Sequence, residues 1–129
     1  MAERNSQLQQ YRALLADLPV RLLDVPEEVI SSVHLAVVRL NQTTINQHRQ
    51  VFEDLRAAGI GVQLHYSPVH LQPYYRRLGF HEGNFPEAEA YASSAISLPL
   101  FPDLSVADQQ RVVVGLADQL RSVAPELAA

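Results

Sequence analysis

The chain has 129 residues, 47% hydrophobic and 19% charged, so its size and composition fit one globular domain. Arginine supplies every basic residue, and the net charge of −4 argues against a basic surface for nucleic acid. Cysteine is absent, which excludes disulfides, thiolate zinc sites and a cysteine nucleophile. No stretch has the pattern of a targeting or membrane-spanning segment, so we expect a cytoplasmic protein without membrane contacts.

The first half of the chain predicts a helix, a strand and a second helix. Residues 3–18 carry apolar side chains at helical spacing and end before a proline. Residues 19–32 contain two prolines and predict a connection with at most one short edge strand. Residues 33–40 (VHLAVVRL) have the composition of a buried strand. Residues 43–58 form the next predicted helix, which opens with the capping-box pattern TINQ and keeps His48 on its solvated side.

The second half predicts two strands and three helices. Residues 62–66 alternate in polarity as a half-buried strand does, and short helices are predicted at 74–78 and 86–95. Residues 96–100 predict a strand that lies at an edge, because its proline lacks a backbone donor. Ser105 caps the last helix. This order predicts a small α+β domain with a three- or four-stranded, mainly antiparallel sheet and helices on one face.

One segment has an unusual composition for its position. Residues 59–75 (GIGVQLHYSPVHLQPYY) concentrate histidine, glutamine and tyrosine directly after a predicted strand, where side chains often carry function. The residue types allow a polar ligand surface, because aromatic faces stack on planar groups and the polar side chains hydrogen-bond phosphates or hydroxyls. A metal site at His65, His70 and His81 is a second interpretation, and ordinary packing of a strand and turn is a third.

The same segment carries a family resemblance. GIGVQLHYSPVHLQPYYRRLGF, followed by GNFPEAEAYASSAISLPLFPDLSVADQQRVV, resembles the C-terminal domain of sugar aminotransferases of the DegT/DnrJ/EryC1/StrS family. The motifs GI-x(4)-HY-x-P, H-x-Q-P-x-Y, G-x-FP-x-AE and SLPL-x-P occur in the family's order, and the resemblance covers about residues 3–123. Within the family, the segment is most similar to members that aminate a UDP-linked keto-sugar on the route to pseudaminic acid.

The resemblance implies a division of the enzyme between two domains. Family members are fold-type I enzymes whose large domain holds pyridoxal phosphate on a lysine; glutamate donates the amino group and a nucleotide-linked keto-sugar accepts it. This chain contains no lysine. We therefore expect residues 1–129 to be the small C-terminal domain, with 1–18 as a connecting helix. The large domain of the same parent chain is the expected partner, in a homodimeric parent. The fragment alone is expected to be inactive and to bind no cofactor or metal.

The resemblance also implies which residues contact the nucleotide-sugar, although none is expected to be catalytic. The main candidates are Gln63, Leu64, His65 and Tyr66, and the weaker ones are His70, Gln72 and Tyr74, which we expect to be exposed or at a domain interface. Strand periodicity also predicts that Leu64 packs in the core. Two alternatives stay open: a stand-alone module that binds a nucleotide or amino acid, and a non-catalytic interaction domain. A detached domain should expose an apolar patch, partly on its first helix.

Overall fold

The computed structural model describes residues 2–26, 28–29 and 31–125. Three strands form one antiparallel sheet in the order β1-β2-β3, which confirms the predicted α+β class. In chain order the elements are α1 (Ala2–Leu14), β1 (Val20–Leu22), β2 (Ala36–Leu40), α2 (Ile45–Ala57), the 3-10 turn η1 (Val69–Leu71), α3 (Pro73–Arg77), α4 (Pro86–Ala92), β3 (Ala95–Leu98) and α5 (Val106–Val123).

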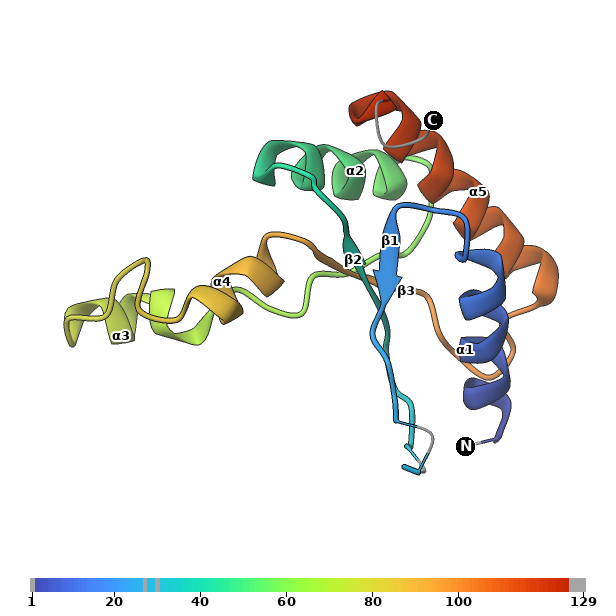
Figure 1. Cartoon of the computed structure of the whole chain (residues 1–129), viewed down its shortest axis with the longest axis horizontal. Coiled ribbons are helices and arrows are strands. Elements are labelled where there is room, and N and C mark those ends of the chain that lie inside the picture. Colours follow the sequence, from blue (N-terminus) through green and yellow to red (C-terminus); the bar gives the residue numbers. More distant parts are fainter. Residues whose placement is uncertain (1, 27, 30, 126–129) are drawn as a thin grey trace.

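The two faces of the sheet have different surroundings. Helices α1, α2 and α5 pack their apolar side chains against one face, and the fully buried residues there include Tyr11, Leu55 and Leu116. Val38 of β2 and Ile96 of β3 are directly opposed and belong to this core. In Figure 1, α1 and α5 lie on one side of the strands, whereas α3 and α4 extend away on the other side. The second face of the sheet therefore looks toward the extension.

Local signals in the sequence account for several element boundaries. The predicted capping box of α2 is confirmed: the Thr44 hydroxyl accepts from the Gln47 amide, and the Gln47 side chain accepts from the Thr44 amide. Gly59 follows α2 with a φ of 77°, a conformation that glycine adopts without steric cost. Ser105 caps α5 by accepting from the amide of Asp108.

Other predicted boundaries are wrong. The first helix ends at Leu14, one turn before the predicted end, and a turn follows it. The strand predicted at 33–40 begins only at Ala36, and α4 ends at Ala92 because the chain turns into β3. The strand predicted at 62–66 is reduced to one isolated bridge, between Gln63 and Ser97.

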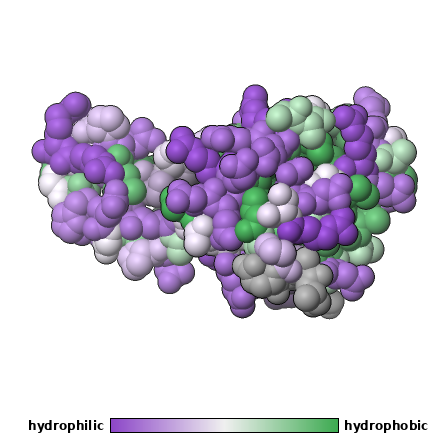
Figure 2. Space-filling model, turned by 90° about the horizontal axis from the view of Figure 1, so that it is seen from above, coloured by the Kyte–Doolittle hydropathy of each residue, from purple (hydrophilic) through white to green (hydrophobic). Residues whose placement is uncertain are grey.

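The extension, residues 67–92, is named the arm below. Figure 2 shows it as a separate lobe whose surface in this view is mostly hydrophilic. Neither α3 nor α4 contains a buried residue, so the two helices of the arm do not form a hydrophobic core between them. Within the described part of the chain, no helix has the length and hydrophobicity that crossing a membrane requires.

The prediction that the first helix contributes to an exposed apolar patch is wrong. Leu8, Tyr11 and Leu15 are buried in the core of this chain. Exposed apolar side chains gather instead between residues 64 and 85, and include Tyr66, Val69, Tyr74, Leu78 and Phe85.

Candidate functional site

The backbone at Gln63 marks the point where the candidate segment leaves the sheet. The Gln63 amide donates to the Ser97 carbonyl at 3.1 Å, and the Ser97 amide donates back at 2.8 Å. The pairing extends no further along the outer edge of β3. Toward Gly61, Pro99 has no amide hydrogen to donate, and toward His65 the Ala95 carbonyl contacts the buried imidazole of His48 at 3.0 Å. The residues after Gln63 lie outside the ladder.

His65 is held against the sheet by its ring. Its Nδ1 lies 2.7 Å from the hydroxyl of Ser97, whose side chain is buried. Its ring is half-buried, and the Tyr66 ring meets it edge-on at 4.7 Å between centroids. Tyr66 itself is 73% exposed, so one aromatic face is available to a planar group or another polypeptide.

Leu64 and Tyr66 open onto a groove of about 510 Å³ that is lined mostly by the arm, with Ile45 contributed by α2. The prediction that Leu64 packs in the core is wrong, because its side chain is 42% exposed. The ladder stops at Gln63, so the alternation of a strand no longer governs Leu64. The groove is lined by Ile45, Leu64, Tyr66, Ser67, Pro68, Leu71, Glu82, Glu89, Ala92 and Ser93. This lining combines an apolar wall with two carboxylates.

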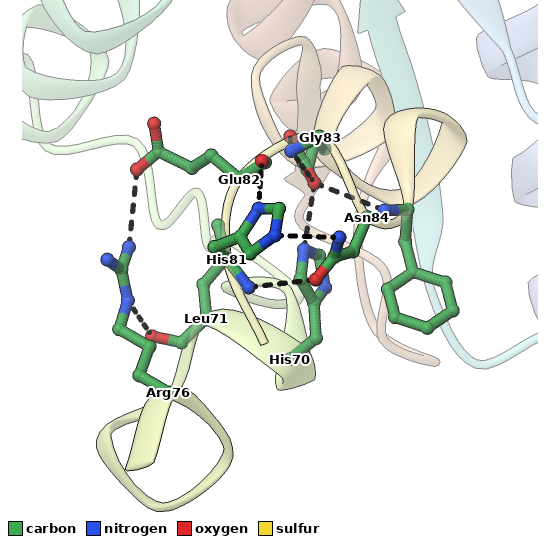
Figure 3. Close-up of polar contacts among 9 residues, drawn as sticks. His70, Leu71, Arg76, His81, Glu82, Gly83 and Asn84 are labelled. Carbon is green, nitrogen blue, oxygen red and sulfur yellow. Dashed lines mark hydrogen bonds and ion pairs between the residues drawn. The ribbon is translucent and has the colours of Figure 1, made fainter. Parts of the chain in front are cut away.

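The weaker candidate His70 is buried, which contradicts the expected exposure. Its Nε2 lies 2.8 Å from the carboxylate of Glu89, and its ring packs against Phe85 at 4.8 Å. The same carboxylate accepts from the amide of Gly83 at 2.9 Å (Figure 3). The Gly83 amide, assisted by His70 and the amide of Phe85, holds the pKa of Glu89 below its ordinary value against the opposing effect of desolvation. His70 therefore fixes the arm internally.

Polar contacts also organise the rest of the arm. Arg76 donates from Nε to the Leu71 carbonyl at 2.8 Å and from Nη2 to Glu82 at 3.2 Å (Figure 3). The His81 amide donates to the Asn84 side chain at 2.9 Å. These hydrogen bonds fix the loop between α3 and α4, together with the ring contacts of Phe80 and Phe85 with each other and with Tyr75 and His70.

The remaining candidates lie apart from the groove. Gln72 precedes α3 without capping it by its side chain, and Tyr74 is 60% exposed; neither lines the groove. His65, His70 and His81 belong to three separate sets of hydrogen bonds. Among the described residues there is no group of three or more side chains that could hold a metal ion.

Sequence reasoning missed three residues that shape the site. Ser97 fixes His65, and its signal was present: a polar residue inside the apolar strand AISL. Glu89 fixes the arm, and nothing in its local pattern distinguishes it from a solvated helical glutamate. His48 was predicted on the surface but is buried, because its partner carbonyl comes from a strand 47 residues away.

Comparison with known proteins gives a consistent result. The model of the DegT/DnrJ/EryC1/StrS aminotransferase family matches residues 1–117. A pleiotropic regulatory protein of Geobacillus stearothermophilus is 36% identical over 127 residues, which are 95% of this chain and 32% of that protein. The chain therefore spans about a third of the length of this relative.

Solved structures agree with the family match. Spr1654 of Streptococcus pneumoniae, assigned as a sugar aminotransferase, superposes in its apo form with a TM-score of 0.91 at 27% identity, over 97% of this chain and 32% of that one. Spr1654 is also known in a form with pyridoxal phosphate. Helicobacter pylori PseC, an aminotransferase of pseudoaminic acid biosynthesis, has a TM-score of 0.84 at 24% identity, over 94% and 33% of the two chains; this identity shows a shared fold. The chain belongs to the DegT/DnrJ/EryC1/StrS aminotransferase family.

Proposed function

We propose that this chain is the small domain of a longer pyridoxal-phosphate-dependent aminotransferase and that it covers a nucleotide-linked keto-sugar. The observation that carries the proposal is the groove beside Leu64 and Tyr66, which lies in the segment that matches the family motif. Residues 1–129 form one domain in this proposal. The helix assigned to residues 1–18 is part of its core as well as a connection, since Tyr11 is fully buried.

The cofactor itself does not fit the residues of this chain. Covalent attachment of pyridoxal phosphate requires a lysine amine, and the sequence contains none. In our proposal the cofactor belongs to the large domain of the same parent chain, in a cytoplasmic homodimer, and the fragment alone is inactive. The work left to this chain is binding and orientation: Ser97 fixes the His65 ring, Tyr66 offers an aromatic face, and Gln63 offers an exposed amide.

The finer substrate assignment rests on the sequence motif. HYSPVHLQPYYRRLGF is most similar to the enzyme that makes UDP-4-amino-4,6-dideoxy-N-acetyl-β-L-altrosamine, so we propose a UDP-linked 4-keto-sugar as acceptor and glutamate as donor. The likeness to PseC is a likeness of fold and adds nothing to this choice.

The geometry also bears on the two alternatives. A Tyr66 side chain packed under the chain's own helices would favour a non-catalytic interaction domain. Tyr66 is 73% exposed, so the structure does not favour this alternative. A stand-alone module would bind a nucleotide without the large domain. Titration of the 129-residue chain with UDP tests this, and clear saturable binding by the isolated chain would favour the module.

Steady-state kinetics of the whole parent protein, with glutamate and a UDP-linked 4-keto-sugar, test the proposed function. We expect Tyr66→Ala to raise KM for the nucleotide-sugar about tenfold with a small change in kcat, because stacking on an aromatic face contributes about 1–3 kcal/mol. Phe101→Ala is the matched control, since it removes an exposed aromatic ring that does not line the groove. A parent protein that transfers no amino group to any nucleotide-linked keto-sugar would overturn the proposal.

A further inference from the structure

Two arginines occupy directly opposed positions on the face of the sheet that is turned away from α1, α2 and α5. Arg21 of β1 and Arg39 of β2 are partners in the antiparallel register, and the next residue across the sheet is Ala95. Side chains of opposed residues share a face, with Cα atoms about 4.5–5.5 Å apart. Like charges in this arrangement disfavour the folded sheet unless something negative lies between them.

The chain itself provides no such negative group in its described part. No carboxylate there lies within 4 Å of either guanidinium, which is also true of Arg56, Arg77 and Arg111, whereas Arg12, Arg49, Arg76 and Arg121 have acidic partners. The two arginines line a hollow of about 540 Å³, and none of its lining residues is acidic although the chain carries a net charge of −4. The other lining residues are Leu40, Asn41, Gln42, Thr43, Ala90, Ser93 and Ser94.

Two hydrogen bonds orient the guanidinium of Arg39 and leave its other N–H donors free. Its Nε donates to the Ser94 hydroxyl at 3.1 Å and its Nη2 to the Ala90 carbonyl at 3.4 Å. A guanidinium has five N–H donors, so about three remain on Arg39 for a ligand. Thr43 also lines the hollow, and its buried hydroxyl has no hydrogen-bond partner among the described residues. A preoriented guanidinium beside neutral hydroxyls and amides suits a tetrahedral oxyanion.

We infer that the hollow around Arg21 and Arg39 is a binding site for a phosphate or diphosphate group. Ser93 lines both this hollow and the groove of Tyr66, so the two are neighbours on the surface. Under the proposed function, and resting on it, the hollow receives the diphosphate of the nucleotide-sugar. The affinity for the inorganic anion is a property of this chain and does not depend on the enzymatic activity.

The test is a titration of the 129-residue chain with inorganic pyrophosphate at constant ionic strength, followed by NMR at the Arg21 and Arg39 Nε–H groups and the Ser94 amide. We expect saturable shifts at these groups. Arg21→Gln and Arg39→Gln should each weaken binding about tenfold, the usual effect of losing one charge-assisted contact. Arg49→Gln is the matched control: it removes the same charge from an exposed position on α2, outside the hollow, and should change affinity less than twofold.

The outcomes separate this inference from the proposed function. Equal weakening by all three variants would show unspecific charge attraction and overturn the site, as would shifts that do not saturate. The Arg21 side chain makes no hydrogen bond within the described residues, so its variant keeps the backbone pairing of β1 with β2 even if Arg39→Gln loosens β2. If pyrophosphate binds at the hollow but the parent protein does not transaminate, the anion site is supported and the proposed function is overturned.

Discussion

Tyr11 shows how one polar atom in the core links two segments that are far apart in the sequence. Its ring is fully buried, and its hydroxyl donates to the carbonyl of Pro99 at 2.9 Å. Burial, with a smaller contribution from Asp108, raises the pKa of this phenol above its ordinary value of 10.0. α1 is thereby joined to the segment that follows β3.

Tyr11→Phe should lower the free energy of unfolding by about 1 kcal/mol at neutral pH, because the Pro99 carbonyl loses its partner. Urea denaturation measures this loss, and Tyr74→Phe, at an exposed ring, should leave stability unchanged. The raised pKa means that the folded state holds the phenolic proton more tightly, so Tyr11 stabilises fully below pH 10.0 and less above it. The difference between the wild type and Tyr11→Phe should therefore shrink as the pH rises above 10.

Single residues were predictable where their partners are close in sequence. The capping pair Thr44 and Gln47 could be read from its spacing, and the structure confirms it. His48, one residue further on, could not, because its partner is the Ala95 carbonyl, a contact between distant segments. His70 was misjudged for the same reason: Glu89 lies 19 residues away.

At the scale of elements, the candidate segment shows why a strand pattern overestimates a strand. Residues 62–66 alternate in polarity, but alternation reports only that a strand would be half-buried if a partner edge were available. Pro99 removes one donor of that edge and His48 occupies a carbonyl on the other side of the bridge. The proline could be recognised in the sequence, whereas the histidine could not. The loss of pairing is what leaves Leu64 and Tyr66 facing the groove.

The loop between α3 and α4 should respond to acid through Glu89. The pKa of this carboxylate is lowered in the folded state, chiefly by the Gly83 amide, so the folded state binds the proton less readily than the unfolded state. The stabilising effect of Glu89 is complete above its ordinary pKa of 4.5 and is lost as the pH falls through the lower folded value. We therefore expect the protection of the Gly83 amide, its exchange rate relative to the intrinsic rate at the same pH, to fall below about pH 4.5.

Hydrogen exchange by NMR measures this effect, and Glu89→Gln is its control. The glutamine side chain can still accept from the Gly83 amide but carries no charge, so exchange at Gly83 should no longer depend on pH in this range beyond the intrinsic rate. Acid sensitivity that persists in Glu89→Gln would assign it to another group.

At the scale of the whole molecule, the chain divides into a body with a core and an arm without one. The sequence predicted the helices and strands of the body because their apolar periodicity reports on burial in a shared core. The arm was predicted only as two short helices. Its projection from the body (Figures 1 and 2) depends on contacts such as that of His70 with Glu89, which no periodic pattern encodes.

This division predicts where a protease first cuts the chain. Trypsin cleaves after lysine or arginine, and here only the 10 arginines are available. Arg76 and Arg77 belong to a five-residue helix without a buried residue, so opening this helix costs less than opening β2 or α5, whose apolar faces lie in the core. The earliest products in a limited digest should therefore be two fragments that meet at residue 76 or 77.

Mass spectrometry of a time course identifies these fragments, and the double variant Arg76→Gln/Arg77→Gln provides the control. It should lose the first cleavage while cuts at Arg39 and Arg111 keep their slow rate, because the body is unchanged. First cleavage at Arg111 or Arg39 in the wild type would contradict a body more stable than the arm. The same digest in the presence of the parent's large domain also tests the proposed function. If the arm packs against that domain, cleavage at Arg76 and Arg77 should slow, whereas cleavage in the body should not.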